Sequence, residues 1–198
     1  MSTTDNFRKH TSKNPIQKFL IHNFYEQLLS IARDISPDSV LDVGSGEGFT
    51  LSLLKEKKIG NTLEGLEYSE VAIQLGKEMF PGVNLRQGDI YHMPYADNSF
   101  DLVICSEVLE HLERPEEALQ ELMRVTKKYC LFSVPNEPWF MTANFLRGKN
   151  VSRWGNDIEH INHWSGGAFS QFVGAKLEVL VKKSPFPWTM VLAKKKGL

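Results

Sequence analysis

Apolar side chains recur along the chain at two different spacings, and these spacings predict an ordered series of helices and strands. From Pro15 to about Arg33 the apolar positions repeat every three to four residues, which predicts an amphipathic helix behind an Asn14 cap. Further on, short apolar runs bounded by turn residues predict strands. Strands are expected at 40–43, 62–67, 83–87, 100–105, 129–134, 177–181 and 188–192, and further helices are expected to begin near 49, 69, 115 and 165. The first dozen residues are polar and predict a loose segment.

The order of these elements predicts the fold class. Five β-α units follow one another, which is typical of a parallel sheet covered by helices on both faces. The last two strands are joined only by residues 182–187, which is too short for a helical crossover, so they are expected to pair antiparallel at one edge. The sequence therefore predicts a single domain with an open, doubly wound α/β sheet of seven mostly parallel strands. In such sheets the ligand lies beyond the carboxyl ends of the strands.

The composition excludes several classes of protein. The chain has 198 residues, of which 41% are hydrophobic and 24% charged, so it is too apolar to be disordered and long enough to bury a core. The formal net charge of −1 argues against a general nucleic-acid binder, because such proteins neutralise many phosphates. Cys105 and Cys130 lie in apolar runs and are expected to be buried free thiols. Because the sequence contains neither a signal-peptide core nor a membrane-length apolar stretch, a cytoplasmic location is expected.

A glycine-rich turn joins the first predicted strand to the helix that follows it. The turn reads Asp42-Val43-Gly44-Ser45-Gly46-Glu47-Gly48, and its glycines let the backbone approach a ligand closely. A helix that begins here presents unpaired N–H groups with a partial positive charge. The third glycine falls one position too early for a dinucleotide-binding fingerprint. The turn stands where an adenosine-containing cofactor would lie, but a glycine cluster alone is weak evidence for one.

Polar side chains also follow the next three predicted strands at the same edge of the sheet. Glu67 ends the second strand, where a carboxylate can accept hydrogen bonds from both hydroxyls of a ribose. Asp89 and Ile90 follow the third strand, where they could meet the exocyclic amine and the face of a purine. Ser106 leaves the fourth strand and is expected to face the same ligand.

At these positions the sequence resembles the class I S-adenosylmethionine-dependent methyltransferases, in particular the methyltransferase type 11 and quinone-biosynthesis-like small-molecule enzymes. The resemblance runs through residues 40–48, 65–69, 88–90 and 98–103 and covers most of 36–135. It implies a Rossmann-like fold, S-adenosyl-L-methionine as the cofactor and S-adenosyl-L-homocysteine as the product. By the resemblance, the methionine part is held by Asp42, Gly44, Ser45, Gly46 and Gly48, the ribose by Glu67 and Tyr68, and the adenine by Asp89 and Ile90. The family's common Pro-Gly-Gly before the fifth strand is absent, so a slightly different turn is expected there.

Three interpretations compete for the segment Glu107-Val108-Leu109-Glu110-His111. Its polar groups stand at i, i+3 and i+4, which would place both carboxylates and the imidazole on one helical face. The acids can cap backbone groups near the cofactor, or His111 can act as a general base for a hydroxyl acceptor with Glu107 beside it. The third interpretation is a divalent-metal site completed by His160 or His163, as in similar quinone-pathway and small-RNA 2′-O-methyltransferases. A metal is the less favoured of these.

Two segments are expected to enclose the acceptor. Residues 136–164 form an aromatic-rich insertion whose rings would either cage a flat acceptor or pack the cover itself. Its end, Asp157 to Ser165, is similar to the stretch after the fifth strand in quinone-biosynthesis methyltransferases. Residues 1–35 are expected to form a helical cap beside a methyltransferase domain of residues 36–198. Within the cap, the helix from Pro15 to Arg33 is expected to close the other side of the site as a gate over the cofactor.

The sequence therefore predicts a methyltransferase that acts on a small molecule, at oxygen. An RNA or protein methyltransferase of the same fold is the nearest alternative. An NAD-binding oxidoreductase and a non-catalytic cofactor-binding module are alternatives from other classes, and sequence does not specify the oligomeric state.

Overall fold

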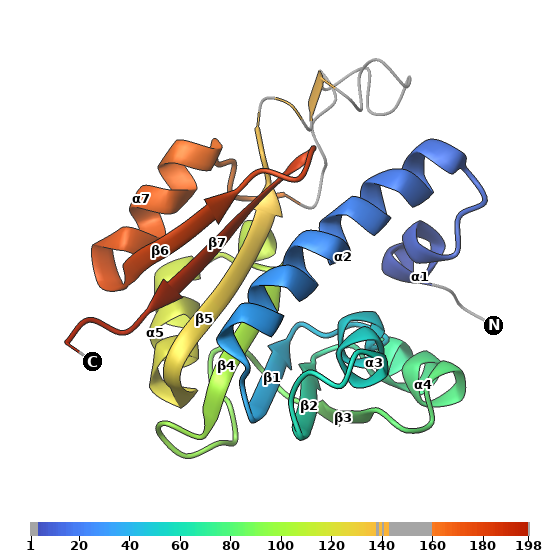
Figure 1. The fold of residues 1–198 in the computed structure, drawn as a ribbon, viewed down its shortest axis with the longest axis horizontal. Helices are drawn as coiled ribbons and strands as arrows, with labels where there is room; N and C mark the ends of the chain where they lie inside the picture. The colour runs from blue at the N-terminus through green and yellow to red at the C-terminus, as the bar shows by residue number, and fades with distance from the viewer. Residues whose placement is uncertain (1–3, 138, 140, 143–159, 198) are drawn as a thin grey trace.

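The computed structural model describes residues 4–137, 139, 141–142 and 160–197. The core of the fold is a seven-stranded sheet with the order β3-β2-β1-β4-β5-β7-β6 (Figure 1). The strands are β1 (Ser39–Val43), β2 (Thr62–Glu67), β3 (Asn84–Gln87), β4 (Phe100–Ser106), β5 (Thr126–Pro135), β6 (Glu178–Lys183) and β7 (Trp188–Lys194). The helices in the described ranges are α1 (Asp5–His10), α2 (Pro15–Ile35), α3 (Phe49–Glu56), α4 (Glu70–Met79), the 3-10 helix η1 (Leu109–His111), α5 (Pro115–Val125) and α7 (Gly166–Lys176).

The pairing of the strands confirms the predicted fold class. β1 to β5 pair in parallel, whereas β7 runs antiparallel to both β5 and β6. The chain reverses direction in the sheet order between β1 and β4, and this switch point is where doubly wound sheets bind their ligands.

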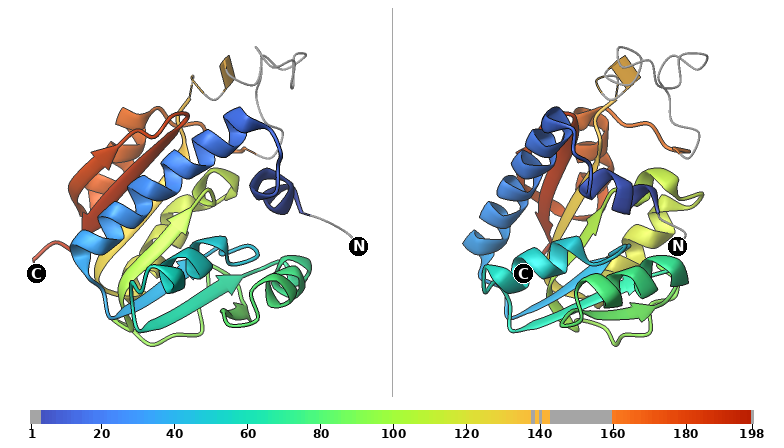
Figure 2. Two further views of the ribbon diagram at one scale, coloured as in Figure 1. Left: turned by 45° about the vertical axis from the view of Figure 1, so that its right-hand side comes forward. Right: turned by 90° about the vertical axis from the view of Figure 1, so that its right-hand side faces the viewer.

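Side chains on the two faces of the sheet belong to different hydrophobic cores. In β4, Leu102 and Ile104 face the core under α2, α3 and α4, whereas Val103 and Cys105 face the core under α5 and α7. This alternation follows from the two-residue period of a strand. Figure 2 shows the two layers of helices on opposite sides of the sheet.

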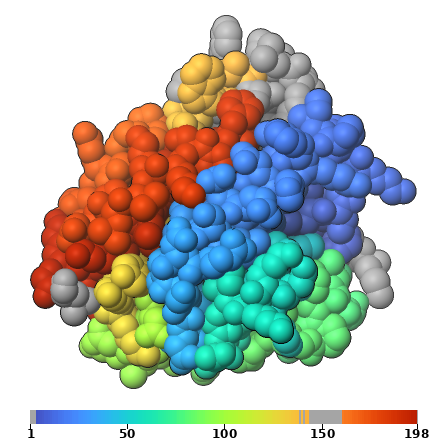
Figure 3. Space-filling view, viewed as in Figure 1, coloured from blue at the N-terminus to red at the C-terminus, as the bar shows by residue number. Residues whose placement is uncertain are grey.

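Helix α2 is an integral part of the domain rather than a separable cap. Asn14 caps the helix by accepting from the N–H of Ile16 at 2.9 Å, as expected for an Asn-Pro start. Along the helix, Phe24, Leu28 and other apolar side chains are buried against the sheet. In the space-filling view α2 lies across the surface between β7 and α3 (Figure 3). Within residues 1–35, α2 thus packs on a core, whereas no residue of α1 is buried.

The prediction of a loose N-terminus is wrong for residues 5–10, which form α1. The Thr4 hydroxyl accepts a hydrogen bond from the N–H of Phe7 at 2.9 Å and caps the helix. Asp5 lies in the first turn, and basic residues occupy the last turn, an arrangement that suits the helix dipole. No residue of α1 is buried, so the helix depends on contacts at the cavity described below.

β5 and the segment after it differ in part from the prediction. β5 begins at Thr126, directly after α5, and its pairing with β4 shifts register between Phe100 and Leu102. Of the aromatic rings predicted to cover the acceptor, Trp164 packs on Phe169 with ring centroids 5.4 Å apart, which favours a packing role for that ring. Trp139 is exposed. Phe140, Phe145 and Trp154 lie outside the described residues.

Two expectations from composition can be compared with the structure. Cys105 and Cys130 are both buried and free, as predicted. Burial raises the pKa of both thiols, to about 12 for Cys130, so neither is a reactive thiolate. Within the described ranges, no helix has the length and hydrophobicity that crossing a membrane requires.

Candidate functional site

A cavity of about 1010 Å³ lies at the carboxyl ends of β1, β2 and β4. Its size is near the upper end of the range for small-molecule sites, which is about 300–1,000 Å³. The predicted residues that line it are Asp42, Gly44, Ser45, Gly46, Glu67, Tyr68, Asp89, Ile90, Ser106, Glu107 and His111. The structure thus brings together nearly all of the residues selected from sequence.

The glycine turn forms one wall of the cavity and needs its glycines for two different reasons. Gly44 has φ +72°, and a Cβ added there would lie 2.3 Å from Cγ2 of Val108. Its N–H donates to the carbonyl of Leu66 at 2.8 Å, which fixes the start of the turn against β2. Gly48 differs from the prediction, because it does not line the cavity and instead precedes α3 in a left-handed conformation.

Glu67 fastens the end of β2 to the glycine turn. Its carboxylate accepts hydrogen bonds from the N–H of Gly46 at 2.8 Å and from the N–H of Ser69 at 2.7 Å. Each carboxylate oxygen has a second acceptor position, so the side chain is held in place and can still accept from a ligand. Tyr68, next to it, is 78% exposed and stands at the rim.

The loop after β3 supplies the polar and apolar pair expected for a purine. Asp89 accepts a hydrogen bond from the N–H of Tyr91 at 2.9 Å, while Ile90 packs against the core under α5 and α7. Both residues line the cavity. The loop is therefore held on one side by the core and faces the cavity on the other.

Two buried hydroxyls at the cavity wall have no hydrogen-bond partner within the part of the chain that the structure describes. They are Ser45 Oγ in the glycine turn and Ser106 Oγ at the end of β4. Buried polar atoms are normally paired, and an unpaired one has an appreciable desolvation cost. A polar ligand in the cavity would supply the missing partners.

Among the carboxyl groups of the wall formed by the glycine turn and Glu67, Asp42 has the most strongly shifted pKa. Burial and the neighbouring Glu67 raise the pKa of Asp42 from 3.8 to about 7, and the nearby Thr50 hydroxyl partly opposes the rise. A carboxyl group in this condition is close to half-ionised at neutral pH. A positively charged ligand group would shift it to the ionised form.

Helix α1 covers the side of the cavity formed by the glycine turn, and sequence reasoning missed its role. The side chains of Thr4 and Asn6 both hydrogen-bond to the carboxylate of Glu47, which is fully buried in the glycine turn. At the other end of α1, Lys9 Nζ lies 3.9 Å from Glu107 Oε2. The helix therefore bridges the glycine-turn wall and the opposite wall. The sequence held one signal for it, a Thr4 cap followed by an acidic first turn and a basic last turn.

His10 at the end of α1 joins the helix to α2 and α3. Its Nδ1 lies 2.9 Å from the carbonyl of Asn6, so Nε2 acts as the acceptor for the Tyr25 hydroxyl, 2.8 Å away. The ring also stacks on Phe49 with centroids 4.2 Å apart. Burial lowers the pKa of His10 from 6.5 to about 4, so the imidazole is neutral at pH 7.

On the opposite wall, the expected helical face of Glu107, Glu110 and His111 is not formed. Glu107 has φ +58° and lies outside η1, which spans only Leu109–His111. Its carboxylate accepts hydrogen bonds from Nε1 of Trp188 and from Oγ of Ser133. Burial raises the pKa of Glu107, and Lys9 and these donors partly counter the rise. Glu107 is thus turned toward β5 and β7, away from the orientation that a helix would give it.

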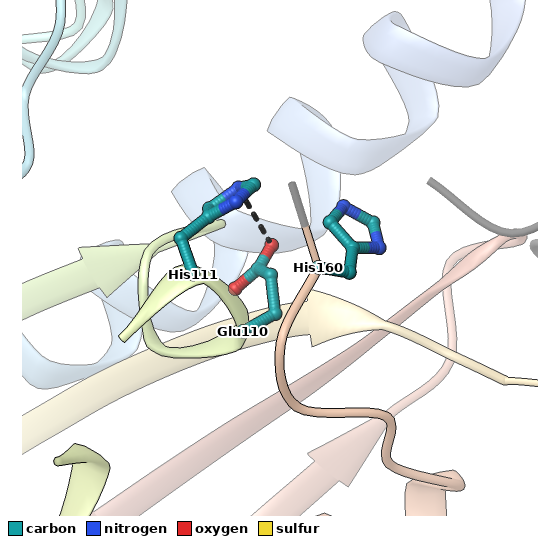
Figure 4. A group of neighbouring side chains, drawn as sticks. All are labelled: Glu110, His111 and His160. Carbon is teal, nitrogen blue, oxygen red and sulfur yellow. Dashed lines mark ion pairs between the residues drawn. The ribbon is translucent and has the colours of Figure 1, made fainter. Parts of the chain in front are cut away.

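Glu110 and His111 do come together with His160, as one of the sequence interpretations required (Figure 4). Glu110 is 1% exposed, and its pKa is raised well above the usual range by burial and by Glu107. His111 lines the cavity, whereas Glu110 and His160 lie behind it. The sequence did not single out Glu137, which gathers with His160 and His163 in an adjoining group.

Comparison with known proteins shows which family the central part of the chain resembles. A family described as methyltransferase domain matches residues 41–134, which run from β1 to β5 and include the glycine turn, Glu67 and Asp89. The matched segment covers just under half of the chain, and over this segment the chain is similar to the class I S-adenosylmethionine-dependent methyltransferases.

Relatives match the central part of the chain. An uncharacterized methyltransferase of Schizosaccharomyces pombe is 40% identical over 101 residues, covering 46% of this chain and 36% of that protein. A demethylmenaquinone methyltransferase of Renibacterium salmoninarum is 36% identical over 88 residues, covering 44% of this chain and 36% of that protein. The matched segment thus spans about a third of the length of these curated relatives.

A solved structure has the same fold over nearly the whole length of the chain. Magnesium protoporphyrin IX methyltransferase from Synechocystis with bound SAH superposes with a TM-score of 0.71 at 14% identity. The superposition covers 96% of this chain and 92% of that one. At this identity the likeness establishes the fold.

Proposed function

We propose that this chain binds S-adenosyl-L-methionine under α1 and transfers its methyl group to an oxygen atom of a small-molecule acceptor. The observation that carries the proposal is the wall formed by the glycine turn and Glu67, whose carboxylate is held by two backbone N–H groups. The unpartnered Ser45 and Ser106 hydroxyls on the same cavity supply a second, independent indication of a polar ligand.

The residues of the cavity fit the parts of this cofactor. Glu67 has acceptor positions for the ribose hydroxyls, and Asp42 has a carboxyl group that an ammonium group would ionise. Asp89 and Ile90 offer a carboxylate and an apolar surface for the adenine. Gly44 lines the same cavity with a left-handed backbone, and Val108 packs so closely against it that a side chain has no room there.

The bound cofactor supplies a methyl group on a sulfonium, so the protein itself has three tasks: to align the acceptor, to keep water out and to accept a proton. Helix α1 closes the cofactor side through Glu47 and Glu107. His111 lines the opposite wall, and an imidazole there can take the proton of an acceptor hydroxyl. Glu107 lies beside it, held by Trp188 and Ser133, and its role is to orient the acceptor.

The near-neutral net charge of the chain favours a small-molecule acceptor over RNA. With a net charge of −1 the chain offers little general attraction for phosphates. Several relatives are named demethylmenaquinone methyltransferase, a name that specifies a quinone-type acceptor for those proteins. A flat ring compound that carries a hydroxyl group is the acceptor class that we propose here.

Calorimetry on the purified chain tests cofactor binding. S-adenosyl-L-homocysteine is expected to bind saturably at one site, while NAD gives no binding heat. Binding of NAD without binding of S-adenosyl-L-homocysteine would refute the proposal.

The catalytic assignment is tested by turnover with a panel of phenols, catechols and reduced quinones and methyl-labelled cofactor. His111→Gln is expected to lower kcat by about 100-fold, in the range of general-base catalysis, with unchanged S-adenosyl-L-homocysteine affinity. His22→Gln, an exposed histidine on α2, is the matched control and should behave like the parent. Equal turnover of the two variants would remove His111 from the mechanism.

A further inference from the structure

Large apolar side chains are exposed at the start of α2 and in the turn before β7. Phe19 is 68% exposed and Ile16 is 67% exposed, and both lie in the first two turns of α2. Phe186, in the turn between β6 and β7, is 48% exposed. Single exposed apolar residues are ordinary on a protein surface, whereas a group of large ones marks an interaction site.

Phe19 lies on the outer face of α2, away from the core. The helix buries Phe24, Leu28 and further residues against the sheet. Phe19 comes nine residues before Leu28, and at roughly 100° per residue the two side chains point in opposite directions. Packing within this domain therefore does not account for a phenylalanine at position 19.

The turn that holds Phe186 lies at the same end of the molecule as the start of α2. This turn is closed by the N–H of Trp188, which donates to the carbonyl of Pro185 at 2.7 Å. The Trp188 ring packs on Phe24, with the ring centroids 5.2 Å apart. Phe19 lies five residues before Phe24, about 7.5 Å along the helix axis. Figures 1 and 2 show both segments at one end of the molecule, with α2 and β7 running away from it side by side.

Lysines without an acidic partner accompany these apolar side chains. Residues 6–25 include four Lys or Arg and no Asp or Glu, although the whole chain has a net charge of −1. Lys13 and Lys18 are exposed and form no ion pair within the described ranges. On β6, Lys183 stands opposite Met190 of β7. Because Met190 belongs to the core under α2, Lys183 projects from the α2 side of the sheet.

The outer patch consists of these exposed side chains from α2, the segment before it and the β6–β7 turn, namely Lys13, Ile16, Lys18, Phe19, Lys183 and Phe186. A lipid surface with anionic headgroups suits its chemistry, because ammonium groups attract the headgroups while large apolar side chains enter the boundary of the acyl chains. A second copy of the chain suits it poorly. In a two-fold dimer the patch would face itself, and the lysines of the two copies would repel each other.

We propose that the outer patch docks this chain reversibly on membrane surfaces that contain anionic lipids. The patch combines few apolar side chains with few charges, so both contributions are needed for binding. Binding through it is therefore sensitive to salt, which screens the attraction between lysines and headgroups.

The two elements that carry most of the outer patch also line the cavity. Ile21, Phe24 and Tyr25 of α2 contribute to its wall, and so does Trp188 at the start of β7. Docking through the patch thus brings the cavity close to the lipid surface, where apolar compounds concentrate. An acceptor taken from the bilayer follows from this placement. That step alone rests on the proposed function, whereas docking itself does not.

Cosedimentation of the full chain with vesicles tests the proposal. Vesicles of phosphatidylcholine and phosphatidylserine in equal parts are expected to bind the chain at low salt and to release it at high salt. Vesicles of phosphatidylcholine alone are expected to bind it much less. Lys13→Gln and Lys18→Gln should each weaken binding to the mixed vesicles by about 5-fold. Phe19→Ser and Phe186→Ser should each weaken it by about 10-fold.

Helix α4 supplies matched controls away from the outer patch. Val71 is an exposed apolar residue and Lys77 an exposed lysine of this helix, and neither lines the cavity. Val71→Ser and Lys77→Gln should bind the mixed vesicles like the parent. Thermal unfolding followed by circular dichroism verifies that every variant is folded.

Three outcomes would overturn the proposal. The first is that the parent does not bind the mixed vesicles, and the second is that the α4 controls lose as much binding as the patch variants. The third is a concentration-dependent dimer in sedimentation velocity that Phe19→Ser abolishes, because it would assign the patch to a second copy. Calorimetry with S-adenosyl-L-homocysteine on the same samples separates the two proposals. Cofactor binding without vesicle binding refutes docking alone, and vesicle binding without cofactor binding refutes the proposed function alone.

Discussion

The carboxylate of Glu67 accepts a hydrogen bond from the backbone N–H of Gly46, 21 residues earlier in the chain, at 2.8 Å. This bond joins the end of β2 to the middle of the glycine turn. The residue proposed to hold the ribose therefore also shapes the turn proposed to hold the methionine part. Changes at either position are expected to affect the whole cofactor wall.

Glu67→Ala is expected to weaken binding of S-adenosyl-L-homocysteine strongly. A hydrogen bond to a charged group is worth about 1.5–3 kcal/mol, so even one lost bond corresponds to a decrease of about 10- to 100-fold. Glu70→Ala is the matched control, because Glu70 is exposed in the first turn of α4 and does not line the cavity. Equal affinities of the two variants, measured by calorimetry, would show that Glu67 does not hold the cofactor.

Gly44→Ala is expected to destabilise the glycine turn and to reduce cofactor affinity. The added Cβ would meet Val108 Cγ2 at 2.3 Å and would sit on a backbone with φ +72°. Val108→Ala alone should cost about 1 kcal/mol of unfolding free energy, as a modest side-chain truncation. In the double variant the clash is relieved but the backbone strain stays, so affinity should recover only in part. Full recovery of cofactor affinity would mean that the steric conflict with Val108 alone, and not the left-handed backbone, requires glycine at position 44.

The raised pKa of Asp42 predicts that the stability of the chain and its cofactor affinity both depend on pH. The pKa of Asp42 is raised from 3.8 to about 7 in the folded chain, so the folded state binds this proton more tightly than the unfolded state. The free energy of unfolding is therefore highest at low pH and decreases as the pH rises from about 4 to about 7. Above pH 7 the Asp42→Asn chain is therefore expected to have a larger free energy of unfolding than the parent, by between about 1 and 4 kcal/mol. Denaturant titrations at pH 5 and pH 8 measure the difference.

The same substitution should change the pH profile of cofactor affinity. Binding of a ligand with an ammonium group favours the ionised carboxylate, so affinity in the parent should rise from pH 6 to pH 8. The Asp42→Asn chain should bind more weakly and show a flatter profile. Parallel profiles for the two chains would contradict the placement of the ammonium group at Asp42.

Asn6→Asp tests whether α1 retains the cofactor. The new carboxylate would face the buried Glu47 and repel it, which should release α1 from the glycine turn. Faster dissociation of S-adenosyl-L-homocysteine, followed by stopped flow, is expected with an unchanged melting temperature of the ligand-free chain, because α1 buries no residue. Asp5→Asn, on the exposed side of α1, is the control and should dissociate at the parental rate. Identical rates for the parent and Asn6→Asp would refute a retaining role.

The strand and helix pattern could be predicted because each element carries its own local signal. The apolar run of β4, the Asn14-Pro15 start of α2 and the glycines before α3 need no knowledge of distant residues. The edge of the sheet that bears the ligand follows from topology alone, so Glu67 and Asp89 were found by position. Gly48 was assigned to the ligand by resemblance, but in the folded chain it serves the entry into α3.

Other features depend on contacts that the sequence does not display. α1 buries nothing and shows no apolar period, so only its bonds to Glu47 and its stacking on Phe49 make it part of the site. The helical face expected for Glu107 and Glu110 fails because Glu107 takes a left-handed backbone and bonds to Trp188, 81 residues away. Glu137 joins His160 only when β5 and the segment before α7 meet in space.

By itself, the sequence determined the doubly wound sheet, the family and the edge that carries the cofactor wall, because periodicity and turn chemistry act over a few neighbouring residues. Only the tertiary structure decided which side chains share one cavity, which carboxylates are buried, and which side chains stand beside Glu110 and His111. Burial, desolvation and ligand geometry depend on residues far apart in the chain, and these become neighbours only when the sheet has closed around its two cores.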